Sequence, residues 1–299
     1  MSMGIGEEIH KMEHSGRVVG LAWSGSGDML VSAGEDRYIH IWYPAGGRVL
    51  SLIAKPGTKP TAICLSPDSK LLALGTSSGM IQIFSMKSGT LVHEMMCASS
   101  PIEALAWSPS GEYLAYAYGD EIGVWSIFSK ECIAILRAHR GAIRDMCWSP
   151  KGDILISGDD DKVVHVWRAD TWSPMARLSG FICPVVSVAI GPLGDMVAGA
   201  SKDGIIRVWR APTWRRLNVI SIGSKISAIS WGPRRSIICG CEDGGLWLWV
   251  IGGEKLMIGS HDSAITSVSW SQERGLMASG DSSGIVKVWS IGSPQTICT

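Results

Sequence analysis

The chain has 299 residues and a formal net charge of zero, with 27 basic and 27 acidic side chains. Proteins that bind nucleic acid phosphates or an anionic membrane need a basic surface, so we expect no direct nucleic acid partner. The N-terminal segment is acidic and has no apolar core, and no apolar run is long enough to span a membrane. We therefore expect neither a secretory signal nor membrane insertion.

A short strand is expected at residues 8–12, ahead of a unit that the chain repeats seven times. The first three units cover about residues 15–52, 58–95 and 100–135, and the last runs from Ser263 to Trp289. The fifth and sixth units follow the same plan as the fourth, which is the clearest copy.

The fourth unit, His139–Trp167, defines the elements of every copy. Ala142–Trp148 interleaves apolar and polar residues, Ile154–Ser157 is a second short strand, and Val163–Trp167 is a third one rich in β-branched residues. Turn sequences rich in Gly, Pro and Asp separate these strands. A sheet this small cannot bury a core alone, so the copies must stack on one another.

Large apolar side chains recur at two fixed places in the unit. The spacing between closing aromatics is 40 to 42 residues, which is typical of four-stranded propeller blades. Rings at fixed places predict the packing of each blade on the next. The closing residues are Trp42, Phe84, Trp125, Trp167, Trp209, Trp249 and Trp289. The second series, in the first strand, is Trp23, Leu65, Trp107, Trp148, Ile190, Trp231 and Trp270.

Over essentially its whole length the chain resembles the WD-repeat β-propeller family. The Trp-Asp pair that names the family never occurs, and the Gly-His pair is also missing. The resemblance implies an all-β fold, a seven-bladed β-propeller of four-stranded antiparallel blades, with residues 1–299 as a single domain. We expect the N-terminal segment 1–13 to close the ring, through pairing of Glu8–Met12 with Ile285–Trp289. The tail, residues 292–299, is the alternative closing segment.

The family also has a buried hydrogen-bond tetrad of His, Ser or Thr, Asp and Trp within a blade. The resemblance implies two complete tetrads, so we expect blades 1 and 4 to be rigid and blades 2 and 3 to be softer. Blade 7 has the other three residues, and we expect it to lack the Asp. The two expected tetrads are His14, Ser32, Asp36 and Trp42 in blade 1, and His139, Ser157, Asp161 and Trp167 in blade 4.

In related propellers, partners contact one rim through a few positions in each blade. Opposite charges occur within single blades, as Arg17 with Glu35, Arg144 with Asp160 and Lys225 with Glu242. They indicate either local surface pairing or a surface for a peptide of mixed charge. The rim lacks the aromatic pair that binds arginine in some relatives, which disfavours a histone-tail reader of that kind. The candidate partner-binding residues, called the rim below, are Arg17, Glu35, Lys59, Glu103, Tyr118, Arg144, Asp160, Lys202, Lys225 and Glu242.

Aromatic residues follow the third strands of blades 3, 4 and 5 on the opposite face. Phe128, Trp172 and Trp214 either form an apolar contact patch or fold back on their own blades. We expect no catalytic residues, cofactor or metal. The run Asp159–Asp161 is interpreted as a solvated turn with one structural Asp, and Cys239 and Cys241 do not have the spacing of zinc ligands.

The sequence therefore predicts a non-catalytic scaffold that presents fixed loops to one or more proteins or peptides. We expect a monomeric propeller within a larger hetero-complex. Scattered cysteines favour free thiols and an intracellular location, in the cytoplasm, the nucleus or both. Two alternatives stay open: a reader of peptides or modified tails that uses the central channel, and a propeller enzyme with titratable groups in that channel.

Overall fold

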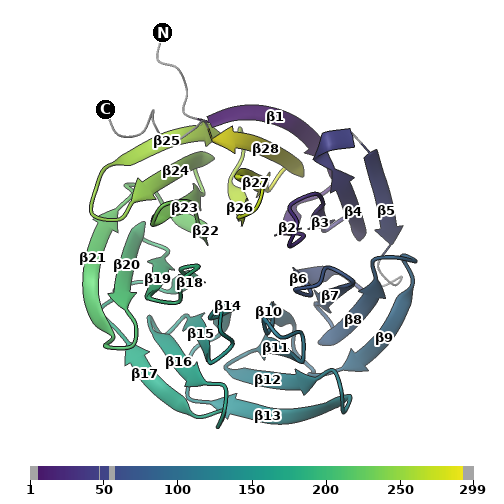
Figure 1. The fold of residues 1–299 in the computed structure, drawn as a ribbon, viewed down its shortest axis with the longest axis horizontal. Coiled ribbons are helices and arrows are strands. Elements are labelled where there is room, and N and C mark those ends of the chain that lie inside the picture. Colours follow the sequence, from purple (N-terminus) through teal and green to yellow (C-terminus); the bar gives the residue numbers. More distant parts are fainter. Residues whose placement is uncertain (1–5, 47, 54–57, 292–299) are drawn as a thin grey trace.

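The computed structural model describes residues 6–46, 48–53 and 58–291, and these form seven four-stranded antiparallel sheets arranged in a ring (Figure 1). The expected all-β, seven-bladed propeller is confirmed. The proposed C-terminal tail 292–299 lies outside the described residues, as do residues 1–5 of the N-terminal segment. A short 3-10 helix, η1 (Pro44–Gly46), follows the third strand of blade 1. Within the described ranges, no helix is long and apolar enough to cross a membrane.

Each blade runs outward from the central channel. The innermost strands are β2 (Val18–Trp23), β6 (Pro60–Leu65), β10 (Ile102–Trp107), β14 (Ile143–Trp148), β18 (Val185–Ile190), β22 (Ile226–Trp231) and β26 (Ile265–Ser271). The second strands are β3 (Leu30–Gly34), β7 (Leu71–Thr76), β11 (Tyr113–Tyr118), β15 (Ile154–Asp159), β19 (Met196–Ser201), β23 (Ser236–Cys241) and β27 (Leu276–Asp281). The third strands are β4 (Tyr38–Tyr43), β8 (Met80–Ser85), β12 (Glu121–Ser126), β16 (Val164–Arg168), β20 (Ile205–Arg210), β24 (Gly245–Val250) and β28 (Ile285–Ile291). The outer strands are β5 (Arg48–Ile53), β9 (Leu91–Met96), β13 (Glu131–Arg137), β17 (Pro174–Leu178), β21 (Arg215–Ser221), β25 (Lys255–Ser260) and, for blade 7, β1 (Gly6–Glu13).

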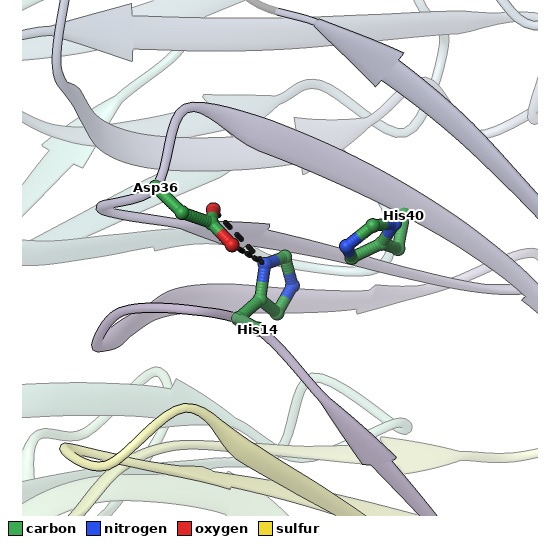
Figure 2. A group of neighbouring side chains, drawn as sticks. All are labelled: His14, Asp36 and His40. Carbon is green, nitrogen blue, oxygen red and sulfur yellow. Dashed lines mark hydrogen bonds and ion pairs between the residues drawn. The ribbon is translucent and has the colours of Figure 1, made fainter.

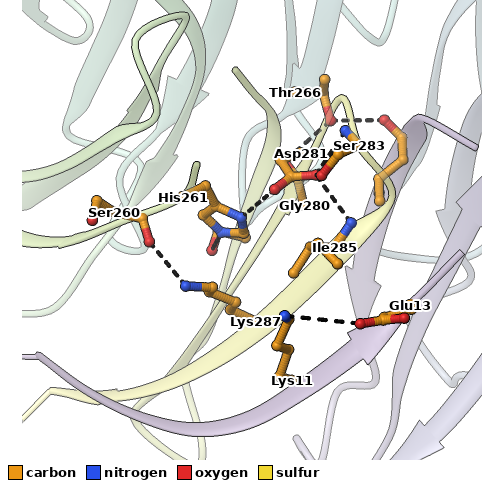
Figure 3. Close-up of polar contacts among 12 residues, drawn as sticks. Lys11, Glu13, Ser260, His261, Thr266, Gly280, Asp281, Ser283, Ile285 and Lys287 are labelled. Carbon is orange, nitrogen blue, oxygen red and sulfur yellow. Dashed lines mark hydrogen bonds and ion pairs between the residues drawn. The ribbon is translucent and has the colours of Figure 1, made fainter. Parts of the chain in front are cut away.

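The N-terminal strand β1 closes the ring. It pairs antiparallel with β28, so that Glu8 faces Trp289 and Met12 faces Val286. The predicted pairing is confirmed. Side chains support it as well, because Lys287 Nζ lies 2.9 Å from Glu8 Oε2 of β1. Lys287 also donates to the Ser260 carbonyl of blade 6 at 3.1 Å (Figure 3).

The core lies between the blades. The described residues form seven hydrophobic clusters, and each cluster joins two neighbouring blades. At the interface of blades 3 and 4, Trp167 is 1% exposed and packs with Trp148 against blade 3. Trp148 Nε1 also donates to the Ala106 carbonyl of blade 3 at 3.1 Å. The recurring rings thus hold each blade on its neighbour, as their spacing predicts.

Candidate functional site

The rim residues lie at or next to the ends of the inner and second strands, where one backbone hydrogen bond recurs in nearly every blade. The residue after the second strand donates its amide hydrogen to the carbonyl of the residue just before the inner strand. This bond joins Asp160 to Ala142 at 3.0 Å and Glu242 to Lys225 at 2.8 Å. The same bond is made by Glu35 to Arg17, Ser77 to Lys59, Lys202 to Pro184 and Ser282 to Ala264. This bond therefore holds the start of the inner strand and the end of the second strand side by side in each of these blades.

Blade 3 departs from this pattern because its turn is one residue shorter. Tyr118 pairs with Ile102 in the strand ladder, and its hydroxyl donates to Glu121 Oε2 at 2.8 Å. The side chain thus contacts its own blade. Tyr118 is not placed like the other rim residues.

Rim charges connect blades in pairs. Glu35 contacts Lys59 of blade 2 at 3.2 Å. We expected Glu35 to pair within its own blade, with Arg17. The sequence could not show that the next blade brings a lysine closer.

Arg144 and Glu242 each contact two partners. Arg144 binds Asp160 of its own blade, as expected, and also lies 3.7 Å from Glu103 of blade 3. Glu242 lies 3.7 Å from Lys225 in its own blade and 4.0 Å from Lys202 of blade 5. Exposed pairs of this kind contribute only about 0–1 kcal/mol to folding, so these charges remain available to a partner.

A central channel with a volume of about 310 Å³ opens among the inner strands. Thr61 and Thr266 direct their hydroxyls to the next blade and donate to the carbonyls of Ile102 and Val18 at 2.6 and 2.7 Å. Every blade contributes the same inner-strand position to the wall. These residues are Val19, Thr61, Glu103, Arg144, Val186, Ser227 and Thr266.

Asp145 is a channel residue that sequence reasoning missed. Its carboxylate accepts hydrogen bonds from Ser187 Oγ and Val188 N of blade 5 at 2.7 and 2.9 Å. Burial raises the pKa of Asp145 to about 6, although the bonds from Val188, Ser187 and Met146 act in the other direction. Alignment of the repeats could have identified Asp145, because the other six blades have the small residues Gly, Ala or Ser at this position.

The proposed aromatic patch on the opposite face is not formed. Phe128 is 97% exposed. Trp172, however, is partly buried and packs edge-on against Tyr113 at 5.3 Å between ring centroids, and Trp214 packs into the core cluster of blades 4 and 5. Of the two alternatives, the structure favours rings that fold back, because Trp172 and Trp214 both fill space at blade interfaces.

The tetrad of blade 1 contains the four expected residues. Ser32 Oγ lies 2.7 Å from His14 Nε2 and accepts from Trp42 Nε1 at 2.8 Å. His14 Nδ1 lies 3.1 Å from the Asp36 carboxylate. Burial lowers the pKa of His14, against the opposing effect of Asp36, so the ring is kept neutral.

The tetrad of blade 4 uses a different aspartate from the one predicted. His139 Nδ1 contacts Asp159 at 2.6 Å, whereas Asp161 is exposed. The assignment of Asp161 was wrong because the acid can follow the serine by two residues instead of four. In blade 1 the nearer position is Gly34, where an added Cβ would lie 2.5 Å from both His14 Nδ1 and Asp36 Oδ1. The two positions therefore compete for the same space.

Blade 7 also has a complete tetrad, contrary to expectation. His261 Nδ1 contacts Asp281 at 2.7 Å (Figure 3). Ser279 Oγ bonds both His261 and Trp289. Asp281 follows Ser279 by two residues, as Asp159 follows Ser157. The expectation that tetrad blades are the rigid ones stays a prediction, and it now includes blade 7.

Two tetrads have a second histidine beside them. His40 in β4 lies next to His14 and Asp36 (Figure 2), and His165 in β16 lies next to His139 and Asp159. In each group, one possible ligand atom from every residue lies within 4.8 Å of the others. Burial and the neighbouring His139 lower the pKa of His165 to about 4, so its ring is neutral at physiological pH.

Known protein families match the repeats described above. A model described as "WD domain, G-beta repeat" matches residues 6–43, 172–210 and 253–290, and a model described as "IFT140 first beta-propeller" matches residues 53–177. Each WD match ends one residue after a closing Trp of the repeat. The chain belongs to the WD-repeat β-propeller family.

Individual relatives of this WD-repeat propeller are distant. "WD repeat-containing protein slp1" of Schizosaccharomyces pombe is 23% identical over 91% of this chain, which spans 57% of that relative. "Protein LST8 homolog" of Drosophila melanogaster is 28% identical over 54% of this chain and 54% of its own length. The chain thus spans little more than half of these relatives. A chain in the "Crystal Structure of Mitotic Checkpoint Complex" has a TM-score of 0.88 at 22% identity, covering 95% of this chain and 91% of that chain, which shows the shared fold.

Proposed function

We propose that this propeller is a non-catalytic protein-interaction scaffold whose partner binds the rim. The supporting observation is the set of mixed, partly exposed charges at strand ends and turns, where a backbone hydrogen bond recurs from blade to blade. Glu35 with Lys59, Glu103 with Arg144, and Lys202 with Glu242 each join two blades. Such a surface presents fixed charges of both signs to a partner, and charge complementarity favours specificity and fast association.

The relatives support this proposal through their names. One solved relative comes from a mitotic checkpoint complex, and "Small ribosomal subunit protein RACK1" of Drosophila melanogaster is 26% identical over 48% of this chain. We extend from them the role of a subunit in a larger intracellular assembly, in the cytoplasm or the nucleus. The propeller would enter that assembly as one copy bound to other proteins.

The channel favours a scaffold over a tail reader or an enzyme. A reader needs an aromatic or strongly acidic mouth, but the described lining residues include no aromatic side chain, and Glu103 is paired with Arg144. Asp145 has a shifted pKa, but hydrogen bonds to blade 5 hold its carboxylate. Neither feature provides a nucleophile with an adjacent base.

The test is affinity purification from native lysate with the protein and two variants. The rim variant exchanges a paired charge, Arg144→Asp with Asp160→Arg, which keeps the attraction within that pair, breaks the contact with Glu103 and reverses the field that a partner meets. The matched control is Phe128→Ser on the opposite face. We expect a stoichiometric partner that the rim variant loses and the control keeps. Loss with Phe128→Ser alone would place the interface on the other face, and absence of any partner would contradict the scaffold.

A further inference from the structure

The His165 ring packs beside the blade 4 tetrad and against Trp167, but its Nδ1 takes no part in the tetrad's hydrogen bonds. Its side chain is 6% exposed, and its Nδ1 has no hydrogen-bond partner among the described residues. Its ring centroid lies 4.3 Å from that of His139, which belongs to the blade 4 tetrad. A buried polar nitrogen without a partner is costly, so its presence requires a physical reason.

The donors around this nitrogen suit a transition metal. His139, Asp159 and His165 each offer one ligand atom, and these atoms lie within 4.8 Å of one another. In a tetrahedral zinc site with bonds of 2.0–2.1 Å, donor atoms are about 3.3 Å apart, so small rotations would bring the three into range. Two imidazoles and one carboxylate form a known type of Zn²⁺ ligand set with an open fourth position.

The tetrad supplies the outer support that a metal-binding histidine needs. Ser157 Oγ lies 2.6 Å from His139 Nε2 and also accepts from Trp167 Nε1 at 2.8 Å. With a metal on Nδ1, the ring proton moves to Nε2, which then donates to Ser157. A fixed partner on the second nitrogen holds a ligating imidazole in orientation.

The charges near the cluster favour a cation. Asp161 and Arg177 both interact electrostatically with His165, in opposite directions. Two carboxylates, Asp159 and Asp161, therefore stand against one guanidinium.

The chain carries a second copy and a natural negative control. In blade 1, His14, Asp36 and His40 repeat the set, and the ring centroids of the two histidines are 4.4 Å apart (Figure 2). Blade 7 has the same tetrad, but Lys287 replaces the second histidine and binds Glu8 and the Ser260 carbonyl. A lysine at this position is thus compatible with an intact tetrad.

We propose that blades 1 and 4 each bind one Zn²⁺ ion. The ion lies between the His–Asp pair of the tetrad and the histidine in the third strand of the same blade. This proposal departs from the expectation, based on the sequence, that the chain binds no metal. It gives the Nδ1 of His165 a ligand and makes these two blades responsive to metal.

The test is Zn²⁺ titration of the full, chelator-treated protein by calorimetry, with Co²⁺ absorption as a report on ligand type. We expect two ions per chain, and spectra of nitrogen and oxygen ligands without thiolate charge-transfer bands. His165→Lys copies blade 7 and should lower the stoichiometry to one, as should His40→Lys. The double variant should bind none.

Two further variants keep the result interpretable. Cys132→Ser removes an exposed thiol and should leave two ions bound. If His165→Lys fails to fold by circular dichroism, His165→Gln takes its place, because Gln82 occupies the same position in blade 2. A folded variant at His165 or His40 that still binds two ions would overturn the proposal, and so would folded native protein that binds no Zn²⁺.

Discussion

At the scale of single residues, the place of one carboxylate decides how a blade completes its buried network. Blade 1 uses Asp36, four residues after its serine, while blades 4 and 7 use Asp159 and Asp281, two residues after theirs. Gly34 leaves the space that Asp36 fills. The aspartate of the tetrad can therefore come from either of two sequence positions while the hydrogen bonds of the tetrad stay the same.

Replacement of the two acids of blade 4 should have unequal effects. Asp159→Ala leaves His139 buried without its acceptor and should lower the free energy of unfolding by about 1–3 kcal/mol. Asp161→Ala changes an exposed side chain and should alter the free energy of unfolding by no more than about 0.5 kcal/mol. Chemical denaturation in metal-free buffer measures both. Equal losses would contradict the assignment of Asp159 to the tetrad.

Asp145 should give the channel a pH dependence. Its folded pKa, raised to about 6, lies above the value of 3.8 for a free Asp. Its contribution to stability is therefore present below pH 3.8 and is lost as the pH rises through 6. The slope from one proton is at most about 1.4 kcal/mol per pH unit.

The variant Asp145→Ala, which copies blades 2, 3 and 6, should lack this slope. The stability advantage of the native protein over the variant should shrink between pH 4 and pH 6 and then stay constant. Urea denaturation at several pH values tests this. If the difference in stability between the native protein and the variant does not change with pH, the pKa of the Asp145 carboxyl is not raised.

At the scale of elements, the turns after the third strands show how packing overrides backbone preference. Lys130 and Trp172 occupy the same turn position in blades 3 and 4, with φ of 57° and 55°, a left-handed region that favours glycine. Blade 2 has Gly89 there. The lysine is exposed, whereas the tryptophan packs on Tyr113 and Trp148.

Glycine at these two positions should have opposite effects. Lys130→Gly relieves backbone strain and should raise the free energy of unfolding by about 1 kcal/mol. Trp172→Gly gains the same relief but loses ring packing, with a net loss of about 2 kcal/mol. Thermal and chemical denaturation compare the two. A gain in both variants would mean that the Trp172 ring contributes no packing.

Much of the element pattern was predictable from the sequence, because turn residues and recurring rings mark every blade. The partner of β1 followed from alignment, since the segment before His139 is an outer strand and the one before His14 has no earlier blade. Contacts between blades were not predictable in this way. Glu35 meets Lys59, and Asp145 meets Ser187, only because the ring places neighbouring repeats side by side.

At the scale of the whole molecule, stability is distributed over seven interfaces rather than one centre. Each core cluster belongs to two blades, so a blade is complete only when both neighbours are present. In repeat proteins, stability is approximately a sum of such neighbour terms. A closed ring adds one interface that an open array of the same repeats lacks.

Deletion of residues 1–13 should therefore affect the whole ring. It exposes the edge of β28 and removes the Glu8 partner of Lys287. The melting temperature should fall by roughly 10 °C or more, since about 1 kcal/mol corresponds to 2–4 °C in domains of 150–250 residues. Lys11→Ala removes only an exposed ion pair and is the control. An unchanged melt after the deletion would rule out β1 as the closing strand.

Closure by β1 also sets a schedule for the nascent chain. Gly6 pairs with Ile291, so the first strand leaves the ribosome long before its partner is made. At 5–20 residues per second, the interval is roughly 15–60 s. During that time the edge of β1 that will later pair with β28 is open to wrong partners. A chaperone that holds β1 would thus control when the ring closes.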